Sequence, residues 1–428
     1  MNNLKKTDVI YQVFVRNFSD EGTFKKVEEK LGYIKSLNAT MIQLLPINPI
    51  GKIDRIGKIG SPYSISDYLA INPDLGTVED LKSLIKSAHK IGLKVIQDIV
   101  FNHTSKDSVL LKQHPDYYFR DEKDNFIIKF PEWSDIIDIN HKNPELEKYL
   151  IGVLKYYVEL GIDGFRFDVA SLIRKEFFSE SKNELLKINP NLIYIAECVD
   201  SGFINLMRRQ GFDCYSNQEL VDNGIDGLYH YASWGPFRNF LKSKDDKDLQ
   251  QYKGALYVEG DAISKDAYII RAIENHDYPR IASYSKVESF TRSLLSYSFF
   301  TTGPAFVFNG EECKDDIKPN LFEKDVINLK VTDKDYFDFF MKSSCLKARE
   351  VNNKLRNTTC LDSSSLSLVM QNNYEDHIEI GVFNFAERKN IITSNDFIDG
   401  IYKDLLTGKE IKIENKTLKV DQPLILVK

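Results

Sequence analysis

Several short apolar segments of this sequence end in charged side chains that could do chemistry. Asp168 and Arg166, two residues apart, close one segment, Glu197 closes the next, and Asp277 follows a third. Carboxylates that meet in space can transfer protons to and from a reacting bond, or they can hold a catalytic metal ion. An isolated Arg–Asp pair is more often structural, so the case depends on whether these residues converge.

Two histidines stand in comparable positions. His103 comes shortly after Asp98 at the end of another apolar segment, and His276 directly precedes Asp277. One or two apolar segments could end in a charged residue by chance. Four segments with charged residues at their C-terminal ends are not explained by solubility alone. We therefore expect one shared site, provided that the segments are parallel strands.

Eight apolar or β-branched segments predict the strands that carry these residues. Helical sequence follows each of them, so the strands are expected to be parallel and to close a (β/α)8 barrel over residues 1–350. Barrel enzymes carry their chemistry at the C-terminal ends of the strands, where these polar residues would meet. The predicted strands are Val9–Val15, Met41–Leu45, Leu93–Val100, Ile162–Phe167, Leu192–Ala196, Phe212–Tyr215, Tyr268–Ile273 and Ala305–Phe308.

Three helices are predicted from apolar spacing and end signals. Phe24–Leu37 has one apolar face and is expected to be a single helix. Thr77 can cap a helix over 78–91, and Pro144 begins a helix that Gly161 ends.

Two further units are predicted beside the barrel repeats. Residues 104–142 are too long for a plain loop and carry Trp133 and other aromatic side chains, so we expect a small insertion domain over the barrel mouth. Residues 351–428 alternate apolar and polar positions and are expected to form an antiparallel β-sandwich. Its predicted strands include Leu366–Met370, His377–Phe383 and Ile411–Val420.

The composition favours a neutral polar substrate and a reduced, cytoplasmic protein. The 57 basic and 63 acidic residues are mixed along the chain and leave a net charge of −6, so no nucleic-acid partner is expected. No apolar run reaches membrane-spanning length, and no export signal follows the first residues. The five cysteines have neither metal-site nor disulfide spacing. The sequence predicts no particular oligomeric state.

Four segments together resemble the signature blocks of the α-amylase family of glycoside hydrolases, in that family's order. The resemblance covers about residues 8–350 and implies a retaining reaction through a covalent glycosyl intermediate. Asp168 would be the nucleophile, Glu197 the general acid and then the base, and Asp277 would stabilise the distorted sugar. The four segments are Asp98–His103, Gly164–Asp168, Ala196-Glu197 and Asn275–Asp277.

The same resemblance implies which residues bind the sugar. Arg166 would also keep Asp168 ionised. Arg280 would either touch substrate or support the loop that carries it. The residues expected to bind substrate are Tyr63, His103, Arg166, His276 and Arg280.

The sequence departs from the family pattern at two places. Many α-amylases carry a Lys-His pair where this chain has Ser171 and Leu172, and the histidine of that pair contributes to a structural calcium site. Asn102 remains as one candidate calcium ligand, so the resemblance allows a structural calcium ion but requires no cofactor. Exo-acting relatives often have Asp after the tyrosine that stands here as Tyr63, whereas this chain has Ser64.

These features favour hydrolysis of α-1,4 bonds in maltodextrins or similar α-glucan oligosaccharides. Transfer to a sugar hydroxyl, as in a glucanosyltransferase, would use the same carboxylates, and an α-1,6- or exo-acting α-glucosidase is a further alternative. A non-catalytic binding module would be expected to have lost the carboxylates. A metal-dependent barrel hydrolase could use Asp98, His103, Asp168, Glu197 and Asp277 as ligands.

Overall fold

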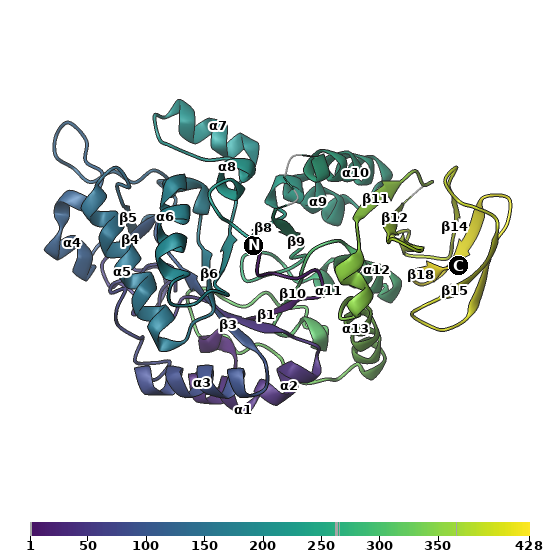
Figure 1. Ribbon diagram of the computed structural model, residues 1–428, viewed down its shortest axis with the longest axis horizontal. Helices are drawn as coiled ribbons and strands as arrows, with labels where there is room; N and C mark the ends of the chain where they lie inside the picture. Colours follow the sequence, from purple (N-terminus) through teal and green to yellow (C-terminus); the bar gives the residue numbers. More distant parts are fainter. Residues whose placement is uncertain (1, 262–263, 265, 365) are drawn as a thin grey trace.

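The computed structural model describes residues 2–261, 264, 266–364 and 366–428. Eight parallel strands form one sheet in the order β10-β1-β2-β3-β6-β7-β8-β9. A parallel bridge between Arg271 and Ala305 connects the two edges, so the predicted barrel is confirmed (Figure 1). The strands are β1 (Val9–Val13), β2 (Met41–Leu44), β3 (Lys94–Ile99), β6 (Gly164–Phe167), β7 (Ile193–Ala196), β8 (Gly227–Tyr229), β9 (Tyr268–Ile270) and β10 (Ala305–Phe308).

The sixth strand is not where the sequence predicted it. Phe212–Tyr215 is irregular chain, and the strand is β8, which has only three residues and begins with a glycine. Phe212 and Cys214 are apolar because they pack in a cluster with Met207 and Leu172 outside the sheet. Buried apolar residues in this loop gave the same sequence pattern as a strand. The actual strand, with three residues, is too short to show an alternation of apolar and polar positions.

Helices surround the barrel, and their predicted end signals are present. Thr77 and Asp80 form a capping box at the start of α3, and Gly161 ends α5 in the left-handed conformation. The predicted helix Phe24–Leu37 is instead two short helices, α1 and α2. The α-helices up to β10 are α1 (Phe24–Glu29), α2 (Leu31–Ser36), α3 (Val78–Lys90), α4 (Val109–Gln113), α5 (Pro144–Leu160), α6 (Lys175–Leu185), α7 (Ser201–Arg209), α8 (Asn217–Val221), α9 (Tyr231–Ser243), α10 (Asp246–Asp261), α11 (Ile281–Tyr284) and α12 (Glu288–Phe300).

Short 3-10 helices and one last α-helix complete this part of the chain. No described helix is long and apolar enough to cross a membrane. The elements are α13 (Lys334–Lys347), η1 (Val15–Asn17), η2 (Pro115–Tyr117), η3 (Ala170–Leu172), η4 (Glu311–Cys313) and η5 (Glu350–Lys354).

The insertion after β3 is held together by a small antiparallel ribbon. Strand β4 (His103–Ser105) pairs with β5 (Ile136–Asp138), and His103 lies opposite Asp138 in the register. Phe130 stacks on Phe203 of α7 at 5.2 Å between ring centroids, which ties the insertion to the βα connection after β7. In Figure 1 the insertion and the C-terminal strands lie at opposite ends of the molecule.

The C-terminal part is the expected antiparallel β unit. A six-stranded sheet, in the order β11-β12-β13-β18-β15-β16, and a two-stranded sheet of β14 and β17 enclose an apolar cluster that includes Val382 and Ile392. The predicted strand Ile411–Val420 is broken into β16 and β17, because Asn415 and Lys416 both turn with positive φ. The strands are β11 (Asn357–Leu361), β12 (Ser367–Asn373), β13 (Ile378–Asn384), β14 (Asn390–Thr393), β15 (Gly400–Asp404), β16 (Glu410–Ile413), β17 (Thr417–Val420) and β18 (Leu424–Val427).

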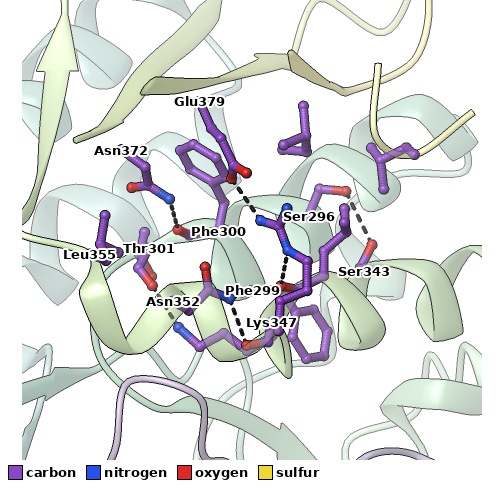
Figure 2. A pocket seen from close by; sticks show the side chains of 14 residues that line it. Ser296, Phe299, Phe300, Thr301, Ser343, Lys347, Asn352, Leu355, Asn372 and Glu379 are labelled. Atoms are coloured by element: carbon purple, nitrogen blue, oxygen red, sulfur yellow. Dashed lines mark hydrogen bonds and ion pairs between the residues drawn. The ribbon is translucent and has the colours of Figure 1, made fainter. Parts of the chain in front are cut away.

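A small pocket lined by both polar and apolar side chains marks the joint between α12, α13 and the C-terminal sheet (Figure 2). Lys347 Nζ donates to the Thr301 carbonyl at 2.7 Å, and burial lowers the pKa of Lys347 to about 7. Asn372 of β12 donates to the Phe300 carbonyl at 2.9 Å. Asn372 thus satisfies a buried carbonyl across the joint, whereas the Lys347 bond lies within the barrel part of the chain.

Candidate active site

The carboxyl ends of β3, β6 and β7 bring three acidic residues to one guanidinium. Arg166, inside β6, is fully buried, and its Nη1 donates to Asp98 at 2.7 Å and to Asp168 at 2.9 Å. Its Nη2 forms an ion pair with Glu197 at 2.9 Å. The charged strand ends therefore converge as expected. Asp168 and Glu197 follow different strands, and both contact the Arg166 guanidinium.

The connections after β2 and β9 complete the cluster through Tyr63 and His276, respectively. The Tyr63 hydroxyl donates to Asp98 at 2.9 Å and lies 2.7 Å from His276 Nε2. His276 Nε2 in turn lies 3.1 Å from Asp277 Oδ2, and its ring stacks on Tyr63 with 5.3 Å between centroids. Asn275 accepts the Asp277 backbone N–H at 2.9 Å, which orients this turn.

Backbone geometry also positions the acid after β7. Val169, next to Asp168, has φ 41°, a left-handed conformation that a β-branched residue rarely adopts. This conformation aims the Val169 N–H at Glu197 Oε2, at 2.9 Å. The strain is therefore coupled to a hydrogen bond on Glu197, as is common at functional sites.

The carboxylates become more exposed from the floor of the site to its mouth. The exposed fractions of the side chains are 0% for Asp98, 8% for Asp168, 12% for Glu197 and 38% for Asp277. A substrate entering the rim would therefore meet Asp277 first and reach Asp168 and Glu197 below it, with Asp98 behind them.

Burial and neighbouring charges together set the pKa values of these carboxyl groups. Burial raises the pKa of Glu197 to about 7 and that of Asp168 to about 6, while the charge of Arg166 lowers both. For Asp277 burial also acts upward, but the charge and hydrogen bond of His276 outweigh it and lower its pKa to about 2. Glu197 thus has the highest pKa of the three and Asp277 the lowest, an order suited to a general acid beside ionised carboxylates.

His103 lies at the edge of the site beside the insertion. Its ring is 5.8 Å from that of Trp133, which is half-buried, and burial lowers the pKa of the His103 imidazole. Asn102, the candidate calcium ligand, is buried, and its Oδ1 accepts a hydrogen bond from Lys129 Nζ at 3.0 Å.

The surroundings of Arg280 favour support of the loop, the other of its two predicted roles, over contact with substrate. It is fully buried, and its guanidinium donates to Glu274 at 2.7 Å and to the Asn309 carbonyl at 2.9 Å. With Asp315 at 3.3 Å as a further partner, every strong contact is internal, and Arg280 supports the loop that carries Asp277.

Three contributors were assigned no role in glycoside hydrolysis from the sequence. Asp98 had a visible signal, since it ends an apolar strand, but its bond to Arg166 required the neighbouring strand. The Val169 N–H and the Lys129 ammonium had no sequence signal, because backbone direction and contact across an insertion are tertiary properties. Trp234 is 6% exposed, and its ring centroid lies 3.9 Å from that of Tyr278, so this side chain belongs to the packed interior.

Two family models match nearly the whole chain. Residues 9–364 match the alpha amylase catalytic domain, and residues 365–426 match the bacterial alpha amylase C-terminal domain. The division predicted at residues 350 and 351 is not tested by these matches and stays a prediction.

Individual relatives are similar in sequence and in fold. The chain is 29% identical to Alpha-amylase 3 of Dictyoglomus thermophilum over 72% of its own length and 64% of that protein's, so it spans just under two thirds of this relative. It is 31% identical to an oligo-1,6-glucosidase of Bacillus sp. over 73% of each chain. The crystal structure of an alpha-amylase from Lactobacillus plantarum superposes with a TM-score of 0.91 at 30% identity, covering 100% of both chains.

Proposed function

The chain belongs to the α-amylase family of glycoside hydrolases, and we propose that it hydrolyses α-1,4-glucosidic bonds of maltodextrin-like glucans with retention of anomeric configuration. The observation that supports this most directly is the shared contact of Asp168 and Glu197 with Arg166. Two carboxyl groups of different pKa beside one guanidinium suit a double displacement at a sugar carbon.

In the first step the ionised Asp168 attacks the anomeric carbon as Glu197 gives its proton to the departing glycosidic oxygen. The bond from the sugar to that oxygen breaks, and a bond from the sugar to Asp168 forms. In the second step water attacks the same carbon, Glu197 takes the water proton, and Asp168 leaves as a carboxylate. Glu197 ends protonated, as it began.

Asp277 and its neighbours would bind the reacting glucose. Asp277 is ionised and is the most exposed of the four carboxylates, so it can accept hydrogen bonds from sugar hydroxyls. His276 and His103 would donate hydrogen bonds, and Tyr63 would offer its ring face. Trp133 is the aromatic residue of the insertion that stands beside His103.

Ser64 supports attack within a glucan chain. Its Oγ donates to the Asp135 carbonyl of the insertion at 3.1 Å, and the side chain is 3% exposed. It therefore offers no carboxylate to read a non-reducing end. An α-1,6-acting enzyme is the second candidate, favoured by the similarity to an oligo-1,6-glucosidase.

A substrate panel with product analysis tests the specificity. Maltoheptaose should yield glucose and short maltodextrins, and proton NMR should show the α-anomer forming first. Isomaltose as the preferred substrate would favour the α-1,6 candidate, longer products would indicate transfer, and a β-anomer formed first would exclude retention.

Two variants test the catalytic roles. Asp168→Asn and Glu197→Gln should each lower kcat by roughly 10³-fold or more, since both steps need both groups. Glu197→Gln should regain part of its rate on an aryl glucoside whose leaving group needs no proton, whereas Asp168→Asn should not. Glu184→Gln on the exposed face of α6 is the matched control, and equal losses in all three variants would contradict the assignment.

A further inference from the structure

Three buried polar side chains meet where the insertion joins the barrel. Lys129 Nζ lies 3.0 Å from Asn102 Oδ1 and 3.5 Å from Asp138 Oδ1. The side chains of Lys129 and Asp138 are 3% and 0% exposed, and Asn102 is 0% exposed. These residues come from the loop after β3, from the middle of the insertion and from β5, so one ammonium connects three segments.

The donor set does not fit a structural calcium ion. Calcium requires six to eight oxygen ligands, and here the Asn102 amide oxygen already accepts from Lys129. Asp138 Oδ1 accepts from Asn102 Nδ2 at 3.2 Å, and Oδ2 accepts the Lys129 backbone N–H at 2.7 Å. Among the described residues, no group of three or more His, Cys, Asp or Glu side chains could hold a metal.

Charge balance leads to the same conclusion. Lys129 and Asp138 neutralise each other, and the rings of Phe119 and Phe212 lie 5.0 Å and 5.9 Å from the ammonium. The faces of aromatic rings attract an ammonium group. A divalent ion added beside Lys129 would place two further positive charges next to the ammonium, and both oxygens of Asp138 already accept hydrogen bonds, from Asn102 and from the Lys129 backbone. Such an ion could enter only by displacing the ammonium.

We propose that the Lys129 ammonium takes the place of a structural metal ion. The ammonium links the insertion to the barrel and orients Asn102 toward His103. An ammonium can only donate, so Asn102 Oδ1 must face Lys129 and its Nδ2 must face the other way. Asn102 Nδ2 lies 3.1 Å from His103 Nδ1. His103 Nδ1 therefore accepts, and the ring proton of the neutral imidazole resides on Nε2.

This arrangement makes Lys129 a positioning residue for the site. Lys129 acts on substrate only through Asn102 and His103. This positioning role rests on the proposed function, whereas the replacement of a metal ion does not. The tautomer it selects leaves a ring N–H on His103 for a sugar hydroxyl. Because the partners of Lys129 are all internal, its effect should be visible without substrate.

Thermal unfolding of the full chain tests the metal replacement. The midpoint of the wild-type protein should be the same in EDTA and in millimolar calcium chloride. Lys129→Met should lower the midpoint by roughly 5–10 °C, because it leaves Asp138 buried without its cation. The double variant Lys129→Met/Asp138→Asn should recover part of this loss, and Lys123→Met, on an exposed lysine of the insertion, should leave the midpoint unchanged.

Three outcomes would overturn the proposal. They are a rise in the wild-type midpoint with calcium, a fall with EDTA, and a Lys129→Met variant as stable as Lys123→Met. If Lys129→Met fails to fold, the wild-type measurements with calcium and EDTA still decide the question.

Nitrogen NMR on histidine-labelled protein tests the positioning role. In the wild-type protein, neutral His103 should show the Nε2-protonated tautomer, and in the double variant this preference should weaken while KM for maltoheptaose rises severalfold. An unchanged tautomer would remove the positioning role. The stability and NMR results hold whatever the substrate is, so failure of the proposed function would show only in the kinetics.

Discussion

Among single residues, Arg166 controls the charge of the site. Its guanidinium contacts three carboxylates and is fully buried, and it lies 5.7 Å from the ring of Tyr63. Burial raises the pKa of Asp98 and of Asp168 to about 6 and that of Glu197 to about 7, while the charge of Arg166 lowers all three. One cation therefore stabilises a cluster in which acid and base remain distinct.

The pH dependence of kcat/KM should follow from this difference. Activity should rise as pH increases through about 6, where Asp168 loses its proton, and fall above about 7, where Glu197 loses its proton. A profile on maltoheptaose should thus be bell-shaped with its maximum between these values. Activity that keeps rising to alkaline pH would contradict Glu197 as the acid.

Asp98 should be needed although it lies behind the reacting groups. Asp98→Asn removes a charged acceptor for both Arg166 and Tyr63, which costs about 1.5–3 kcal/mol per hydrogen bond. We expect kcat/KM to fall roughly 10- to 100-fold, measured by steady-state kinetics. Asp316→Asn, which breaks an exposed ion pair with Lys286, should match the wild-type protein.

Among the elements, each parallel strand supplies one or two groups and each helix restrains a strand. Asp98 belongs to β3 and Arg166 to β6, and their Cα atoms are register partners in the sheet. The contact between them follows directly from parallel pairing. The helices matter to the site because they hold that register in place.

The capping box of α3 should contribute measurably to stability. Thr77→Ala removes the hydrogen bonds with Asp80 at 3.2 Å and 2.7 Å, which should lower the free energy of unfolding by about 1 kcal/mol. Urea unfolding would measure this loss. Lys86→Ala on the exposed face of the same helix should leave the free energy within about 0.5 kcal/mol of the wild-type value.

In the whole molecule, the barrel and the C-terminal sheet share a continuous apolar core. Phe383 of β13 is fully buried and packs 5.6 Å from Tyr297 and 5.8 Å from Phe300, both on α12. Nearby, Asn372 of the C-terminal sheet donates a buried hydrogen bond to the Phe300 carbonyl (Figure 2). The two units are therefore expected to unfold together.

Phe383→Ala, a substitution in the C-terminal sheet, should destabilise the barrel as well. The cavity should cost about 3–5 kcal/mol, and tryptophan fluorescence should report it because Trp133 and Trp234 both precede the C-terminal sheet. Phe397→Ala, inside the C-terminal cluster, should affect that signal less. An unchanged fluorescence transition in Phe383→Ala would show that the two units unfold independently.

The sequence by itself determined the barrel, the order of most of its strands and the candidate carboxylates, because those depend on local periodicity and on charged residues at strand ends. Only the tertiary structure decided that β8 begins at Gly227, that Arg280 faces inward and that Lys129 stands beside Asn102. A buried aromatic in a loop and one in a strand look alike along the chain, and so do a substrate-binding arginine and a structural one. Their difference lies in which distant atoms they meet, and chain folding alone sets that.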